Sequence, residues 1–137
     1  PTLAVLHKVA LALQVSMEEL VAAPRAAVQF YARDELTVKR RGEVTVRKLL
    51  PDPIPGVEID RIELPPRSQL VGVPHTPGTR EYLTCEAGSI VLSAAGEQWT
   101  LQAGDVVVFL GDQRHAYRNP ERRVAIGYSV VLLARVP

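Results

Sequence analysis

The hydrophobic pattern of the chain changes its period near residue 24. Before that point the apolar residues recur at helical spacing, which predicts an amphipathic helix; they are Leu3, Leu6, Ala10 and Leu13, with Val5, Val9 and Ala12 beside them. Ser16 and Glu19 form a capping box that predicts a second short helix ending near Ala22. Two such helices are too short to bury their own apolar faces, so we expect them to pack on a larger unit.

From residue 27 onward the apolar pattern has the two-residue period of β-strands. Runs rich in β-branched residues alternate with segments that contain Gly, Pro, Asn and Asp, the usual residues of turns. The predicted strands cover residues 28–33, 43–50, 57–64, 80–87, 89–94, 97–102, 105–110, 115–118 and 123–134. No helix-length segment lies between them, which favours an all-β antiparallel sandwich or barrel. We place the helical segment at residues 1–23, a linker with the first strand at 24–42, and the β domain at 43–137.

The composition is typical of one small globular domain. The 137 residues are 47% hydrophobic and carry a formal net charge of +1, without the basic excess of a bare DNA-binding module. A single cysteine, Cys85, excludes an internal disulfide framework and favours the cytoplasm. The sequence has no apolar run of transmembrane length, so we expect no membrane partner. Because the chain begins with Pro1 rather than Met, we expect it to be a fragment.

Two stretches of the β region carry histidine, glutamate, glycine and asparagine at a regular spacing. In PHTPGTREYLTCEAG, His75 precedes Glu81 by six residues, and Gly88 closes the stretch. In GDVVVFLGDQRHAYRN, the matching positions are Gly104, His115 and Asn119. Together the two stretches resemble the paired signature motifs of the cupin family. The resemblance implies a double-stranded β-helix, the cupin jelly-roll barrel, here preceded by the two short N-terminal helices.

The sequence departs from the cupin pattern at four positions. Pro77 stands where the family has its second histidine, and it has no side chain that can bind a metal. Gln69 replaces the leading glycine of the first motif, while Leu110 and Asp112 replace a proline and a glycine of the second. The intact spacing supports the fold more strongly than it supports a metal site.

The resemblance implies a metal site formed by the motif side chains. His75, Glu81 and His115 are then the candidate ligands of a divalent transition metal such as Zn, Fe, Mn or Ni, with coordination positions open for water or a ligand. The alternative is that the same three side chains form a hydrogen-bonded pocket without a metal.

Strand alternation places further side chains beside these three. If Glu81 points inward, Leu83 and Cys85 share its face, and Tyr117 shares the face of His115. The candidate ligand-pocket residues are Arg80, Leu83, Cys85, Phe109, Arg114 and Tyr117. The two arginines flank the motifs, where they either clamp an anionic group or remain solvated. Cys85 fits a packing role equally well.

The segment KRRGEVTVRK is strongly basic. Its five cationic residues are Lys39, Arg40, Arg41, Arg47 and Lys48. They could contact a DNA backbone, but neighbouring acidic residues dilute the patch. We therefore interpret the part from Lys39 to Arg41 as an exposed hairpin turn.

The N-terminal stretch PTLAVLHKVALALQVSMEELV resembles the last two helices of XRE-type helix-turn-helix domains. Regulators of that type often carry a cupin sensor domain, which implies that this chain senses a small-molecule effector and is not an enzyme. DNA contact is then made by the helix-turn-helix domain, whose recognition helix is missing from this sequence. The strand at 123–134 is apolar on both faces, which favours a homodimer.

Two other functions fit the same residues. The first is a small metal-dependent cupin enzyme, a dioxygenase or an isomerase, which the motif histidines and Glu81 favour. The second is a dimerisation domain with an empty barrel.

Overall fold

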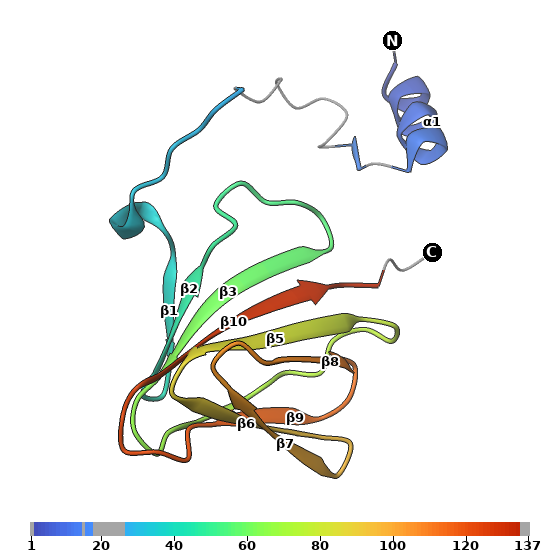
Figure 1. Cartoon of the computed structure of the whole chain (residues 1–137). Coiled ribbons are helices and arrows are strands. Elements are labelled where there is room, and N and C mark those ends of the chain that lie inside the picture. Colours follow the sequence, from blue (N-terminus) through green and yellow to red (C-terminus); the bar gives the residue numbers. More distant parts are fainter. Residues whose placement is uncertain (1, 15, 18–26, 135–137) are drawn as a thin grey trace. The chain divides into compact units, whose positions relative to one another are not determined.

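A computed structural model describes residues 2–14, 16–17 and 27–134 of the chain. It divides into two compact units, residues 1–30 and 31–137 (Figure 1). The first unit contains helix α1, Leu3–Leu13. The Thr2 side chain caps its start by accepting a hydrogen bond from the Val5 amide at 3.2 Å. Gln14 ends the helix in the left-handed conformation. The domain boundaries set after residues 23 and 42 stay predictions.

The two-helix N-terminal segment is not confirmed. Helix α1 matches the first predicted helix, and it is the only α-helix with defined bounds in the part of the chain that the structure describes. Most of the second predicted helix, residues 18–22, lies outside the described residues. Ala10 is buried in α1, whereas Leu3, Leu11 and Leu13 are exposed. A bilayer-spanning helix is not found among residues 2–14, 16–17 and 27–134.

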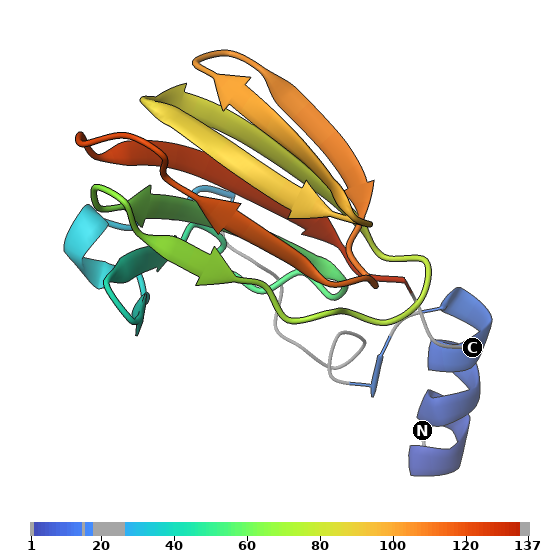
Figure 2. The same cartoon turned by 90° about the horizontal axis from the view of Figure 1, so that it is seen from below.

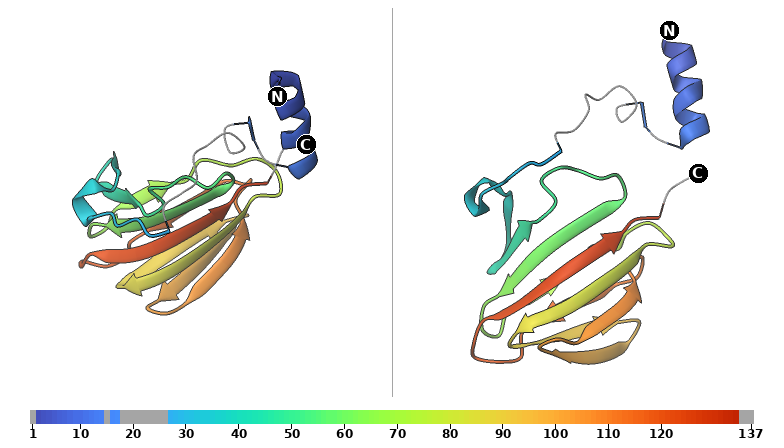
Figure 3. Two further views of the ribbon diagram at one scale, coloured as in Figure 1. Left: turned by 90° about the horizontal axis from the view of Figure 1, so that it is seen from above. Right: turned by 45° about the horizontal axis from the view of Figure 1, so that its top comes forward.

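The second unit consists of two antiparallel sheets. The larger sheet has six strands in the order β1-β2-β3-β10-β5-β8, and the smaller has four in the order β4-β9-β6-β7. Seen from below, the smaller sheet lies over the larger one (Figure 2). Two further views show β1, β2, β3, β10 and β5 side by side (Figure 3). The strands are β1 Val38–Arg41, β2 Val44–Lys48, β3 Val57–Leu64, β4 Gln69–Val71, β5 Arg80–Ala87, β6 Ser89–Ala94, β7 Glu97–Gln102, β8 Val106–Leu110, β9 His115–Arg118 and β10 Ala125–Leu132.

The barrel expected from the motifs is open rather than closed. Among the described residues no strand of one sheet is hydrogen-bonded in a ladder to a strand of the other. Two connections between the sheets contain prolines: Pro65 and Pro66 between β3 and β4, and Pro74 and Pro77 between β4 and β5. Proline has no N–H to donate, so these four positions cannot donate to a ladder at the corners between the sheets.

Most predicted strands from residue 57 onward are confirmed, but three features near the start of the β unit differ. The segment 28–33 is not a strand, and a short 3₁₀ helix, η1, follows at Arg33–Glu35. Lys39 to Arg41 form β1 instead of a turn, because Gly42, with φ of 63°, opens a tight turn that pairs Arg41 with Val44. Strand β4 was not predicted; its three residues pair with β9.

The core lies between the two sheets. Strand β10 is hydrogen-bonded on both sides, to β3 and to β5, and places its alternate residues inward. The largest fully buried apolar side chains are Val44, Leu64, Leu83, Ile90 and Leu92. They come from both sheets, so their burial holds the open barrel together.

Asn119, a cupin motif position, fastens the connection between β9 and β10. The side chain is fully buried. Its Nδ2 group donates to the carbonyl oxygens of Leu64 at 3.0 Å, Pro65 at 3.1 Å and Arg123 at 2.7 Å. Its Oδ1 accepts from the Glu121 amide at 3.0 Å. One amide therefore ties this connection to the end of β3.

We predict that Asn119→Ala lowers the free energy of unfolding by about 2–4 kcal/mol, because the buried carbonyl group of Leu64 and the part-buried carbonyl groups of Pro65 and Arg123 lose their donor. Asn119→Asp keeps the shape but turns an acceptor toward the same carbonyls, so its loss should be at least as large. Urea unfolding of the two variants and the wild type measures both effects. Wild-type stability of Asn119→Asp would contradict this role of the amide donors.

Candidate functional site

The cavity that contains the motif residues has a volume of about 360 Å³. Its wall includes residues of β1, β2, β3, β5 and β10 from the larger sheet and of β4 and β9 from the smaller one. Four of its polar side chains are almost completely buried, and we call them the buried polar cluster: Glu81, His115, Tyr117 and Ser129. The cluster is therefore shielded from bulk water, and its hydrogen bonds determine what the cavity can bind.

Glu81 is the acceptor at the centre of the cluster. It lies on β5, opposite Phe109 of β8 and Val131 of β10. Its Oε1 atom accepts hydrogen bonds from the Tyr117 hydroxyl and from the Ser129 hydroxyl, the latter at 3.2 Å. Because Tyr117 lies on β9, the first of these bonds joins the two sheets across the cavity.

The other oxygen of Glu81, Oε2, has no hydrogen-bond partner among the described residues. His115 Nε2 lies 3.5 Å from it. His115 Nδ1 lies 2.9 Å from the Gln113 carbonyl oxygen. A carbonyl only accepts, so Nδ1 must carry the proton, and in the neutral ring Nε2 is left with a lone pair. Two acceptors then face each other, and a cation or a hydrogen-bond donor from a ligand would complete the arrangement.

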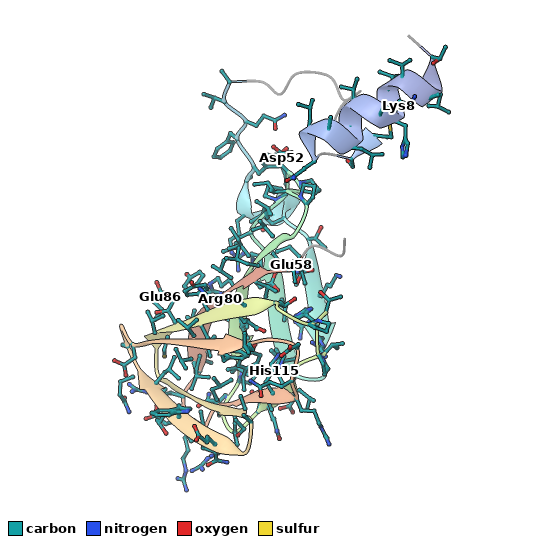
Figure 4. The ribbon with its side chains drawn as sticks, turned by 90° about the vertical axis from the view of Figure 1, so that its right-hand side faces the viewer. Lys8, Asp52, Glu58, Arg80, Glu86 and His115 are labelled. Atoms are coloured by element: carbon teal, nitrogen blue, oxygen red, sulfur yellow. The ribbon has the colours of Figure 1, made fainter. Side chains whose placement is uncertain are left out.

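The His115 ring is held in place on several sides. Its ring centroid lies 5.2 Å from that of Phe109 and 5.7 Å from that of Tyr117. A Cβ atom on Gly72 would overlap the ring, so only glycine fits beside it in this position. His115 appears among the side chains between the sheets in Figure 4. The direction of Nε2 is therefore fixed by packing.

The three candidate metal ligands lie near one another, but they are not arranged as a ligand set. His75 lies in the connection between β4 and β5, and its ring centroid is 6.4 Å from that of His115. In the part of the chain that the structure describes, no group of three or more His, Cys, Asp or Glu side chains is placed to hold a metal ion. Oε2 of Glu81 and Nε2 of His115 are two atoms that can bind a metal ion, and Pro77 offers no such atom. Metal binding by His75, Glu81 and His115 stays a prediction.

Of the six predicted ligand-pocket residues, Tyr117 lines this cavity. Arg80 and Arg114 are exposed, and Leu83 belongs to the hydrophobic core. Phe109 packs on His115 and also lines a second, more open cavity of about 640 Å³ between β6, β7 and β8. We favour the first cavity as the site because it contains the buried polar cluster.

Cys85 lies in the core with its Sγ atom 3.5 Å from the Ala87 carbonyl oxygen. Burial raises the pKa of the Cys85 thiol, which disfavours the reactive thiolate. The environment of this side chain fits its alternative role in packing.

The structure also brings charged residues to the cavity that were not predicted as site residues. Lys39 and Arg41 of β1, Lys48 of β2 and Asp60 of β3 all line it. A signal was present in the sequence: a two-residue turn pairs Arg41 with Val44 and Lys39 with Val46, and the two valines alternate as buried residues do. The two cationic residues therefore share the inner face of the hairpin.

The comparisons with known proteins agree with this architecture. The family model of the cupin domain, Cupin_2, matches residues 61–131, more than half of the chain. The chain belongs to the cupin family. This cupin chain is similar to the HTH-type transcriptional regulator SutR of Escherichia coli (strain K12), with 26% identity over 132 residues that cover 96% of the chain and 71% of that protein.

Two solved structures resemble this cupin. One is the Cupin_2 domain of an XRE family transcriptional regulator from Enterobacter cloacae, with 30% identity, a TM-score of 0.63, and coverage of 67% of this chain and 98% of that one. The other is a predicted oxalate decarboxylase from Thermotoga maritima, with a TM-score of 0.65 and coverage of 77% and 100%. Its 23% identity shows the shared fold alone.

The Tyr117 hydroxyl is the titratable donor of the cluster. Burial raises the pKa of Tyr117 above its ordinary value, and the charge of Glu81 and the hydrogen bond to it raise this pKa further. The folded state therefore holds the phenol proton more tightly than the unfolded state does. This contribution to stability is complete below the unfolded pKa of about 10 and is lost as the pH rises above it.

We predict that the wild type loses unfolding free energy more steeply than Tyr117→Phe between about pH 8 and pH 11, because only the wild type carries this phenol proton. Chemical denaturation across that range measures the two slopes. Tyr82→Phe is the matched control, since Tyr82 lies half-buried on β5 and does not line this cavity. Parallel curves for wild type and Tyr117→Phe would contradict the assignment.

Proposed function

We propose that this chain is the effector-sensing part of a DNA-binding transcriptional regulator. A small molecule binds in the cavity of about 360 Å³ and modulates DNA binding by a helix-turn-helix domain. The observation that carries the proposal is the unpartnered Oε2 of Glu81, which faces His115 Nε2 inside that cavity. A buried acceptor without a partner is costly, and a bound ligand removes the cost.

The regulator assignment draws support from the relatives. The similarity to SutR covers 96% of the chain and so includes residues of both compact units. The XRE family regulator from Enterobacter cloacae supports the same role for the cupin unit. The exposed leucines of α1, which are Leu3, Leu11 and Leu13, suit a helix that packs in a larger DNA-binding domain. In this proposal the recognition helix precedes Pro1 in a longer, cytoplasmic protein.

A homodimer is part of the proposal. The outer face of the larger sheet carries a row of apolar side chains that the strand register aligns: Ile59, Val130, Tyr82 and Val108. Strand β8 is an edge of that sheet, and its Val106, Val108 and Leu110 are about half exposed or more. An exposed apolar face beside an open edge favours contact with a second copy.

The effector acts by binding one arrangement of the regulator more tightly than another. A ligand that binds both arrangements equally shifts nothing. A ligand that donates to both Glu81 and His115 binds one arrangement more tightly if the two side chains approach each other in that arrangement only. Their partners come from both sheets, so a small shift between the sheets would change the approach.

A metal-dependent cupin enzyme is the second candidate. The approach of Glu81 Oε2 to His115 Nε2 favours it, since both atoms are typical ligands of Zn, Fe, Mn or Ni. Such a metal supplies Lewis-acid chemistry when bound. Pro77 removes the ligand that cupin enzymes usually keep. Metal analysis of protein purified without a histidine tag, followed by a turnover assay of the loaded protein, decides between the two functions.

The main test uses the longer protein that ends in this chain. It should retard DNA from upstream of its own gene, and molecules extracted from cells that stabilise the chain in a thermal-shift assay should change that retardation. Absence of retardation with and without these molecules would count against the regulator.

We predict that Glu81→Gln weakens binding of the stabilising molecule by roughly tenfold to a hundredfold, because a charged acceptor in a buried site is lost. Glu86→Gln is the matched control, since Glu86 is exposed on the same strand. Calorimetric titration of both variants gives the affinities, and their melting temperatures without ligand show that they are folded. Equal affinities of Glu81→Gln and wild type would exclude Glu81 from the effector site.

A further inference from the structure

The charged side chains of the cavity are unevenly distributed. Lys39 and Arg41 are exposed and still line the cavity, so they lie at its opening, and we call them the basic rim. Each is paired in register with a buried valine: Lys39 with Val46, and Arg41 with Val44. Both cationic side chains therefore emerge from the face of β1 that turns toward the core.

The two charges of the basic rim are not neutralised by neighbouring carboxylates. The third cation of the wall, Lys48, is neutralised by Asp60, with Nζ to Oδ1 at 2.6 Å. Arg41 donates from Nη2 to the Val71 carbonyl oxygen at 2.7 Å, a neutral acceptor. Lys39 forms no ion pair with any residue in the described ranges, and neither does Arg41. The rim therefore keeps two positive charges for a ligand.

The Arg41 guanidinium is also held in place. Its bond to Val71 joins β1 of the larger sheet to β4 of the smaller one across the opening. One Nη group is used for this bond, and the remaining N–H donors of Arg41 have no hydrogen-bond partner among the described residues. A guanidinium fixed in this way binds an oxyanion with little further loss of side-chain freedom.

The interior of the cavity has the opposite character. Asp60, Glu81 and the hydroxyls of Tyr117 and Ser129 line it, and Glu58 adds a carboxylate to the wall. An anionic group is therefore favoured at the rim and disfavoured near Glu81. A volume of about 360 Å³ suits a small molecule.

We propose that the effector is a small organic anion whose carboxylate or phosphate group binds to Arg41 and Lys39, while the rest of the molecule extends toward Glu81. This inference rests on the proposed sensor function and specifies its ligand. Carboxylate and phosphate share the chemistry that the rim recognises, which is an oxyanion that accepts several hydrogen bonds from cationic donors.

The test uses calorimetric titration and thermal shift of the whole 137-residue chain with matched pairs of probes. Lactate, succinate, benzoate and glycerol phosphate are the anions; lactamide, succinamide, benzamide and glycerol are the neutral counterparts, and inorganic phosphate stands alone. At least one anion should bind, and its neutral counterpart should bind about tenfold more weakly or not at all. The member that binds most tightly shows whether the rim prefers carboxylate or phosphate.

The double variant Lys39→Gln with Arg41→Gln should weaken binding of that anion by about tenfold or more. Arg40→Gln is the matched control, because Arg40 lies on the same strand, pairs with Thr45 and does not line the cavity. Arg40→Gln also removes one positive charge from β1, and it should change the affinity for the anion by less than about twofold. Lys39→Gln alone, which keeps the Arg41 bond to Val71, provides a further variant if the double variant unfolds.

Three results would overturn the inference. One is equal binding of anions and their neutral counterparts, and another is an unchanged anion affinity in both rim variants. In either case, weaker binding of the stabilising molecule by Glu81→Gln would still support the sensor function. The third is that none of the anions in the panel binds at millimolar concentration. If the double variant self-associates and still binds anions normally, the rim protects the edge strand β1 instead.

Discussion

The carboxyl group of Glu81 constrains most of what surrounds it. A carboxyl group buried between two sheets is costly unless hydrogen bonds replace the water that it loses. Among the described residues, only one oxygen of Glu81 receives such bonds, from Tyr117 of the smaller sheet and Ser129 of the larger sheet. Because the Tyr117 bond crosses the cavity, the same interaction that satisfies Oε1 also joins the two sheets of an open barrel. The second oxygen, Oε2, has no hydrogen-bond partner in the part of the chain that the structure describes.

The cavity that results has a polar interior and a cationic opening. The His115 ring packs against Phe109 and Tyr117, and Gly72 leaves room for it because it has no Cβ atom. In this position Nε2 of His115 lies 3.5 Å from the unpartnered oxygen of Glu81. Pro77 leaves the chain without the second motif histidine, which is why we propose ligand binding rather than catalysis. The similarity to SutR and to the XRE family regulator from Enterobacter cloacae supports that proposal, while the predicted oxalate decarboxylase shares the fold alone.

Much of this architecture follows from the sequence, and the differences have physical reasons. Two-residue alternation and short apolar runs predicted β3, β5, β6, β7 and β9, and the resemblance to the cupin motifs implied that Glu81 and His115 meet. The basic rim was missed because Lys39 and Arg41 were assigned to a turn, although Gly42 places the turn one residue later. Arg80 and Arg114 were expected at the pocket from their nearness to the motifs, but nearness along the chain does not decide whether a side chain faces the cavity.

The ¹⁵N chemical shifts of the His115 ring, measured on the whole chain without ligand, test the central claim most directly. The account predicts a proton on Nδ1, held by the Gln113 carbonyl oxygen, and a bare Nε2 whose signal moves when an effector binds. A proton on Nε2 in the absence of ligand would contradict it, because His115 would then satisfy Glu81 by itself and the cavity would lack its incomplete pair.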